Sequence, residues 1–378
     1  LGYNYKQRYL LEFTFRRDGS STFGEGNRWA NFPSVAVGWS FSEEPFIKRL
    51  TGGWLNWGKI RGSYGKSGQT FTSAYLAHGL MNIMDKSFFG KTGITTDKPV
   101  SPYLTWEKTR QYDLGLDMDM FNYRLNVKLD YYYKYTSSLI YDIPIPGSLY
   151  AFGAQVENAM EISNEGLELE LQADILRESA VSWRMKFNMA RNWNRFEKSY
   201  SGKDVVDGDG TLLVVGRPLN GLYVWAHRGY YNSDAEVPRL YKIDGQEIYF
   251  NGVATNGISG AVGDYRLLDL DGDGNPDSYY AGSPLPLAHG GWVNELMWKN
   301  FDLNVLVNFT IGRKMINNRM GLGFSRQSED GHLTKLFDYR KLRPWDGVNK
   351  KPNAPAWGNS LSMNTDSAIE KVHHLALK

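Results

Sequence analysis

The chain has 378 residues, and its 43 basic and 41 acidic side chains give no reason to expect nucleic acid or another polyanion as a partner. It contains no cysteine, which excludes disulfides, iron–sulfur clusters, thiol catalysis and cysteine-ligated zinc. Aromatic residues make up 14% of the chain, with 24 Tyr and 12 Trp, and such rings with polar tips suit a boundary between oil and water. No run of about 18 apolar residues predicts a transmembrane helix, but this leaves membrane strands open because they face lipid only at every second residue.

The dominant period of the hydrophobic pattern is two, as in β-strands. Near the start of the chain, for example, Leu11 and Phe13 alternate with Glu12 and Thr14. The same alternation predicts about ten strands and no helix of comparable length. The clear strands are expected at 8–17, 34–41, 111–119, 125–134, 167–174, 183–189 and 301–310, and weaker ones at 59–65, at 290–299 and from about Lys371 onward.

Short and long connections between these strands alternate along the chain. Outer-membrane barrels have this asymmetry, with short periplasmic turns and long extracellular loops. The connection at 43–57 falls on the periplasmic side, is longer than the other turns, and is expected to hold one helical turn at 45–50. The short connections are expected at Asn122, 176–180 and Asn300, and the long ones at 67–104, 142–163, 196–285 and 313–370.

A soluble β-sandwich or propeller also has alternating strands, so it is the main alternative fold. Two features favour a membrane barrel. The expected strands run about 10–16 residues, well above the length of about 5–6 that is common in soluble proteins. Their polar faces are densely charged, whereas their apolar faces are rich in aromatic residues. A propeller would also show a repeat of about 40–50 residues, and the sequence has none. We therefore expect an all-β, antiparallel transmembrane β-barrel, with residues 1–378 forming part of one barrel domain.

Several motifs occur in a fixed order along nearly the whole chain, and they resemble signatures of the SusC/RagA family of TonB-linked outer-membrane proteins. They are F-R-R-D-G-S-S-T-F-G at 15–24, N-R-W-A-N-F-P-S-V-A-V-G-W at 27–39, S-E-E at 42–44, K-I-R-G-S-Y-G at 59–65, W-E-K-T-R-Q-Y-D-L-G-L-D at 106–117, I-S-N-E-G-L-E-L at 162–169, D-L-D-G-D-G-N-P-D at 269–277 and K-N-F-D-L at 299–303.

This resemblance implies a TonB-dependent transporter in the cell outer membrane, in contact with outer-membrane lipid. Such a barrel has about 22 strands and a plugged lumen. It works with a SusD-like lipoprotein over its extracellular mouth, and it imports glycans or oligopeptides while TonB acts on the plug. We find no plug, TonB box, N-terminal extension or aromatic-ended last strand in the chain. We therefore expect an interior to C-terminal portion of the barrel.

A run of acidic residues in the expected loop 196–285 predicts a structural calcium site. Carboxylates at every second residue, with glycines between them, can converge on one hard cation such as Ca²⁺. The spacing resembles the first half of an EF-hand loop, but Tyr280 stands where the final glutamate would be, which excludes a full EF-hand. A solvated acidic turn is the alternative. The expected ligands are Asp269, Asp271, Asp273, Asn275 and Asp277.

Aromatic residues in the same loop are candidates for binding substrate. Exposed rings stack on sugars, serve at protein interfaces or simply pack a loop, and these three alternatives stay open. The candidates are Tyr223, Trp225, His227, Arg228, Tyr230 and Tyr231.

We expect no catalytic residues and no enzymatic activity. The six histidines lack metal-ligand spacing, and Glu168, Glu170 and Asp174 form a row facing a polar lumen and not a glycosidase pair. The alternative function is an extracellular, soluble glycan-binding β-domain with a structural calcium. Such a domain would stay monodisperse without detergent.

Overall fold

A computed structural model describes residues 1–70, 77, 81–96, 99–150, 153–177, 179–206, 212–237, 239–241, 247–249, 262–268, 270, 277–317, 343–348, 351–354, 356 and 365–378. The chain forms two compact units. The first comprises Leu1–Leu219, Pro286–Ile311 and His373–Lys378, and the second comprises Asn220–Leu285 and Gly312–Val372. No helix among the described residues is long and apolar enough to cross a membrane.

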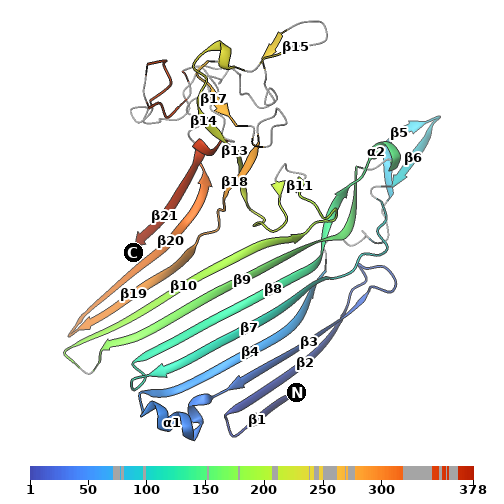
Figure 1. Ribbon diagram of the computed structural model, residues 1–378. Coiled ribbons are helices and arrows are strands. Elements are labelled where there is room, and N and C mark those ends of the chain that lie inside the picture. The colour runs from blue at the N-terminus through green and yellow to red at the C-terminus, as the bar shows by residue number, and fades with distance from the viewer. Residues whose placement is uncertain are drawn as a thin grey trace. The chain divides into compact units, whose positions relative to one another are not determined.

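An 11-stranded sheet dominates the structure (Figure 1). Its strands follow one another in space in the same order as along the chain, and the successive pairs from β1 to β20 are antiparallel. The strands are β1 (Gly2–Tyr5), β2 (Tyr9–Gly19), β3 (Trp29–Trp39), β4 (Leu55–Gln69), β7 (Glu107–Met120), β8 (Leu125–Pro144), β9 (Ala154–Leu176), β10 (Val181–Lys198), β19 (Ala288–Trp298), β20 (Phe301–Ile316) and β21 (Ile369–Leu377).

The predicted all-β architecture is confirmed, and each expected strand has a counterpart in this sheet. The additional strand is β1, whose 4 residues are too few to reveal a period. The long connection expected at 142–163 is wrong, because β8 continues to Pro144 and β9 begins at Ala154. In that region polar residues such as Asn158 interrupt the alternation. The backbone nevertheless stays paired, and Asn158 donates to the carbonyl of Ser138 at 2.7 Å.

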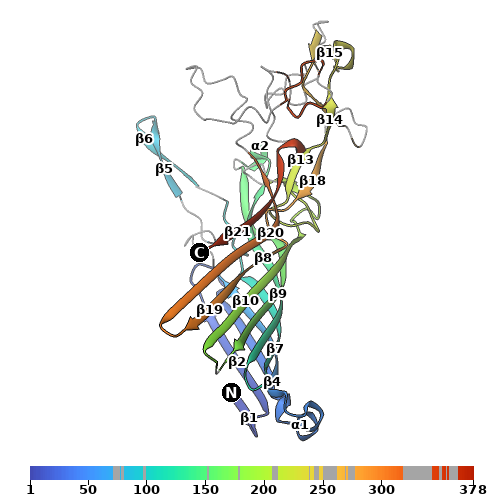
Figure 2. The same ribbon diagram turned by 90° about the vertical axis from the view of Figure 1, so that its left-hand side faces the viewer.

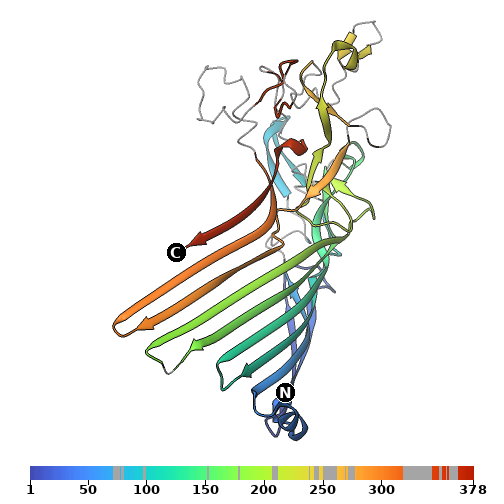
Figure 3. The ribbon, with the colours of Figure 1, turned by 60° about the vertical axis from the view of Figure 1, so that its left-hand side comes forward.

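The short turns lie together at one end of the sheet, here called the short-turn end (Figure 3). Three consecutive residues, Phe121, Asn122 and Tyr123, have φ between 56° and 59°, which lets the chain reverse tightly between β7 and β8. The longer connection between β3 and β4 holds η1 (Phe41–Glu43) and α1 (Pro45–Thr51), so the predicted helical turn is confirmed. Proline at the start of α1 and Gly52, with φ 55°, at its end fit the usual boundaries of a helix.

The opposite end of the sheet carries the longer connections. Between β4 and β7 the chain forms a separate hairpin of β5 (Met81–Phe88) and β6 (Lys91–Thr96), which is visible in Figure 2. A short helix, α2 (Gly147–Tyr150), follows β8, and the pair β11 (Val205–Val206) and β12 (Leu212–Leu213) follows β10. A hydrophobic core also forms in this unit. It comprises Phe23, Phe32, Leu104, Trp106 and Val156.

The second unit is built from short antiparallel pairs. β13 (Leu222–Trp225) pairs with β18 (Ser278–Gly282), β14 (His227–Tyr230) with β17 (Tyr265–Leu267), and β15 (Arg239–Tyr241) with β16 (Glu247–Tyr249). It also contains η2 (Asp234–Glu236) and η4 (Asp366–Ala368). Its small core places Tyr230 and Leu267 against the buried residues Tyr265 and Ala354.

Candidate functional site

One side of the 11-stranded sheet, here called the apolar face, carries large apolar side chains that are exposed. The register aligns them in rows. Leu116 lies opposite Ile60 and Leu129, and Leu129 lies opposite Leu169 on the next strand. Ile60 is 39% exposed and Leu129 is 41% exposed. A soluble protein rarely leaves so continuous an apolar surface in water. The hydrocarbon of a bilayer would cover this surface and keep it out of water.

Aromatic rings bound the apolar face at two levels. Tyr112 lies 4.8 Å from Tyr64 and 6.4 Å from Tyr133, centroid to centroid. At the short-turn end, Phe121 lies 6.1 Å from Trp54. The nine residue steps from Tyr112 to Phe121 span roughly 30 Å along a strand. At a tilt of about 40° this gives roughly 23 Å across a membrane, close to the apolar band of about 25 Å in outer-membrane barrels. The two levels therefore match the aromatic girdles of such barrels.

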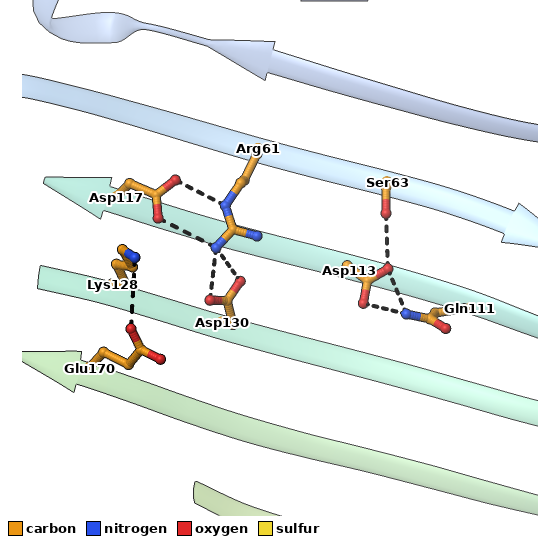
Figure 4. Close-up of polar contacts among 8 residues, drawn as sticks. All are labelled: Arg61, Ser63, Gln111, Asp113, Asp117, Lys128, Asp130 and Glu170. Atoms are coloured by element: carbon orange, nitrogen blue, oxygen red, sulfur yellow. Dashed lines mark hydrogen bonds and ion pairs between the residues drawn. The ribbon is translucent and has the colours of Figure 1, made fainter. Parts of the chain in front are cut away.

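The other side of the sheet, the polar face, is organised around Arg61 (Figure 4). Its Nε lies 2.9 Å from Oδ2 of Asp117, and its Nη2 lies 2.6 Å from Oδ1 of Asp130 on the following strand. The guanidinium can cross β7 because Gly115 lies beneath it. A Cβ at Gly115 would lie 2.5 Å from Arg61 Cζ, so a side chain there would displace the arginine. One cation thus links three strands.

Further polar contacts continue across this face. Asp113 accepts hydrogen bonds from Ser63 Oγ at 2.9 Å and from Gln111 Nε2 at 2.8 Å, and Lys128 Nζ lies 3.8 Å from Glu170 (Figure 4). Toward β19 the ion pairs are Arg184 with Asp174 and Lys186 with Glu295, each at 2.7 Å. Opposite charges on neighbouring strands thus pair across this face. Because these groups are partly exposed, each pair adds at most about 1 kcal/mol to stability. The chief result is a hydrophilic wall.

In the second unit, the structure brings two of the six candidate substrate-binding residues together around Tyr265. His227 meets Tyr265 edge-on at 4.5 Å, and Tyr230 stacks on it at 5.3 Å. Nδ1 of His227 contacts Asp366, which also accepts a hydrogen bond from Tyr279 Oη at 3.1 Å. Burial raises the pKa of Tyr230 and of Tyr265, so both rings stay neutral at physiological pH. For His227 and Tyr230 these contacts match the loop-packing alternative.

The other four candidates have different surroundings. Tyr231 is buried, and burial raises its pKa. Tyr223 lies 5.6 Å from the ring of Tyr280, and Trp225 is partly buried and bridges to Thr365. Arg228 is exposed. The role of all six residues in binding substrate stays a prediction.

Sequence reasoning missed the partners of His227 and the role of Arg61. Asp366 lies 139 residues from His227, and nothing in the spacing connects them. For Arg61 a signal existed, since Gly115 stands where the polar face of β7 would normally carry a side chain. A glycine there marks a place where a neighbouring side chain crosses the strand.

Four of the five expected calcium ligands, namely Asp269, Asp271, Asp273 and Asn275, lie outside the described residues. The fifth, Asp277, accepts a hydrogen bond from the amide of Leu270 through Oδ2, and its own amide donates to the Leu268 carbonyl at 3.0 Å. Within the described part of the chain, no group of three or more His, Asp or Glu side chains could hold a metal ion. Calcium binding therefore stays a prediction.

A sheet with one lipid-facing side between aromatic girdles and one charged side is the wall of a transmembrane β-barrel of the outer membrane. The profile of the family described as "TonB dependent receptor-like, beta-barrel" matches residues 1–281. The chain belongs to this family, and it is a protein of the outer membrane, as predicted.

Two curated relatives support the resemblance to SusC and RagA. TonB-dependent receptor P26 of Formosa agariphila is 31% identical over 395 residues, covering 100% of this chain and 38% of the relative. TonB-dependent receptor SusC of Bacteroides thetaiotaomicron is 29% identical over 352 residues, covering 89% of this chain and 32% of SusC. The chain thus spans about a third of these relatives' length.

Solved structures agree on the fold. The RagAB peptide importer in its open-open state matches with a TM-score of 0.77 and 23% identity, covering 100% of this chain and 38% of that chain. The structure described as the RagAB peptide transporter matches with a TM-score of 0.75 and 22% identity, covering 99% and 39%. At this identity the likeness concerns the fold alone.

Proposed function

We propose that this chain is part of a TonB-dependent importer that carries nutrients across the outer membrane. The observation that supports this most is the two-sided sheet, which presents apolar residues to lipid and a charged face to the interior of a barrel. In the whole protein, this chain supplies barrel wall and extracellular loops. A SusD-like lipoprotein covers the mouth, and TonB acts on a plug. The names of the relatives and the RagAB fold support this arrangement.

We propose a glycan or an oligopeptide as the substrate class. The polar face suits either, because its charges of both signs and its hydroxyl groups contact hydrated polymers without selecting for net charge. RagAB is described as a peptide importer, which favours peptides by analogy. The aromatic residues at 221–231 favour sugars by their chemistry. Six side chains in that segment are the proposed contacts, as predicted from the sequence.

Uptake by cells provides the test. Cells that express the full-length protein with its lipoprotein partner would be given fluorescent oligopeptides of about ten residues or fluorescent oligosaccharides of similar mass. We expect accumulation of one class only, and loss of accumulation when TonB is deleted. Accumulation that persists without TonB, or no accumulation of either class, would contradict the proposal. Accumulation is also compared between two variants. Arg228→Ala removes an exposed candidate residue, and Arg28→Ala removes an exposed arginine from the loop between β2 and β3 as a control.

The soluble glycan-binding alternative conflicts with the exposure of the apolar face. Leu11 and Phe13 are 46% and 44% exposed, and Leu129 lies in the same face. A water-soluble domain with this surface would aggregate. Size-exclusion chromatography of the full-length protein, with and without detergent, separates the two cases. A monodisperse peak without detergent would restore the soluble alternative.

We also propose that the acidic run at 269–277 binds Ca²⁺ as a structural ion. The support is the spacing of its oxygen-bearing side chains, which matches the ligand chemistry of calcium. In the importer such an ion would stiffen the long connection between β10 and β19 without taking part in transport.

A further inference from the structure

Basic side chains recur at the connections of the short-turn end. Each of the five connections there contributes at least one, and most are exposed. Lys6 lies in the β1–β2 turn, Lys48 and Arg49 on α1, Arg124 in the β7–β8 turn, Arg177 in the β9–β10 turn and Lys299 in the β19–β20 turn.

The charge of these groups is only partly neutralised by the protein. Lys48 forms an ion pair with Glu43 at 2.7 Å. Arg124, in contrast, donates to the main-chain carbonyls of Asp174 at 3.2 Å and Ile175 at 2.7 Å, which fix its position but leave its charge uncompensated. Within the part of the chain that the structure describes, neither Arg49 nor Arg124 forms an ion pair.

Two carboxylates at this end, Glu44 and Asp174, have other partners. Glu44 contacts Arg8 at 3.5 Å and accepts a hydrogen bond from Tyr9 at 2.7 Å. Asp174 pairs with Arg184 at 2.7 Å. Glu44 therefore compensates Arg8, Asp174 compensates Arg184 and Glu43 compensates Lys48, so the ion pairs of the described carboxylates leave Arg49 and Arg124 uncompensated.

Exposed aromatic and aliphatic side chains lie beside these cations. Lys299 Nζ lies 5.2 Å from the ring of Trp298, and Lys6 Nζ lies 5.2 Å from the ring of Tyr5. On α1, Phe46 and Leu50 are 60% and 81% exposed and are four residues apart, so they share one side of the helix. An apolar side with basic residues next to it is typical of helices that lie in a membrane interface.

This surface is continuous with the apolar face. Trp54 and Phe121 belong both to the girdle that ends the apolar face and to the connections that carry Arg49 and Arg124. The cations therefore lie at the level where lipid headgroups begin. Figure 3 shows α1 and the turns at this same end of the sheet.

We propose that the short-turn end is a binding surface for anionic phospholipid headgroups of the periplasmic leaflet. The apolar side chains enter the edge of the hydrocarbon, and Arg49 and Arg124 contact phosphates. An anionic lipid is favoured over a zwitterionic one because the latter carries an amine that offsets its own phosphate. The inference rests on the membrane orientation assumed in the proposed function, with the short turns in the periplasm.

The test uses the full-length protein in nanodiscs of phosphatidylethanolamine with about one third phosphatidylglycerol. Spin-labelled forms of each lipid report the fraction held at the protein surface. We expect wild type to hold phosphatidylglycerol preferentially. Arg49→Gln should reduce this preference up to about five-fold, the strength with which an anionic surface attracts one nearby cation. The side chain of Arg49 forms no hydrogen bond within the described part of the chain, so this variant should fold. The double variant of Arg49→Gln and Arg124→Gln should lose more of the preference for phosphatidylglycerol.

The matched control is Arg28→Gln, which removes an exposed arginine from the opposite end of the sheet and should leave the preference unchanged. Equal retention of both lipids by wild type would overturn the inference. So would an equal loss in the control, or an unchanged preference in both arginine variants, which would assign these cations to a protein partner. Uptake is measured in parallel. Lipid preference without uptake would refute the proposed function alone, and uptake without lipid preference would refute this inference alone.

Discussion

Placing a charge at the centre of the apolar face should destabilise the barrel strongly. Leu129 lies four residues from Tyr133 at one girdle and four from Leu125 at the short-turn end of β8, so it sits near the middle of the lipid-facing band. Its side chain is 41% exposed, and its register neighbours are Leu116 and Leu169. An arginine on the lipid face of a barrel costs about 2–4 kcal/mol at the midplane and about 0–1 kcal/mol near the interface.

We therefore expect Leu129→Arg to shift the unfolding equilibrium by about thirty- to several-hundred-fold, since 1.4 kcal/mol corresponds to a factor of about ten. Tyr112→Arg, at a girdle, should shift it less than about five-fold. Ala190→Arg provides a control on the polar face, where it would lie opposite Glu168 in the register. This variant adds the same charge at nearly the same height as Leu129→Arg, and it should leave the unfolding equilibrium unchanged.

The assay is guanidinium unfolding of the full-length protein in liposomes, followed by the heat-dependent shift of the folded band on a gel. The reasoning would be refuted if Leu129→Arg and Ala190→Arg had equal effects, because both sides of the sheet would then face the same medium. It would also be refuted if Tyr112→Arg were as costly as Leu129→Arg, because the girdle would then lie inside the hydrocarbon.

Four further outcomes follow from the structure. Gly115→Val should displace Arg61 and destabilise folding by about 1–2 kcal/mol, whereas Gly115→Val combined with Arg61→Ala should show less than the sum, as a double-mutant cycle in guanidinium would reveal. Asp271→Ala should abolish the heat of Ca²⁺ binding in calorimetry, and an unchanged heat would disprove the calcium site. Asp366→Asn should weaken the contact with its histidine partner and speed amide exchange in β14, while leaving exchange in the barrel strands unchanged. Because burial raises the pKa of Tyr265, the folded second unit keeps a proton that the unfolded chain loses above about pH 10. Its stability should therefore fall as pH rises beyond that point, and less so in Tyr265→Phe, as followed by amide exchange.

The barrel wall could be predicted from the sequence because its two sides face different media. Leu114, Leu116 and Met118 alternate with Asp113 and its polar neighbours along β7. The strand register then places apolar residues beside apolar residues on the neighbouring strands. The alternation stops where the medium becomes the same on both sides. For that reason the strand ends beyond the girdles, such as Ala154 at the start of β9, could not be placed.

The candidate site could be predicted much less completely. Aromatic residues marked the segment 221–231 as unusual, but their surroundings depend on residues far away in the chain. Tyr265 and Asp366 decide how His227 and Tyr230 are held, and no local pattern connects these four. Contacts of this kind come from the path of long connections, which leaves no periodic signal in the sequence.

The length of β8 and β9 has a consequence for how the molecule meets its surroundings. β9 has 23 residues, and Glu165, the register partner of Tyr133, marks the girdle level on it. The eleven residue steps from Glu165 to Ala154 extend on the order of 35 Å further along the strand. The paired strands β8 and β9 thus extend well beyond the girdle level. In the orientation of the proposed importer, this part of the hairpin would project beyond the outer leaflet of the membrane.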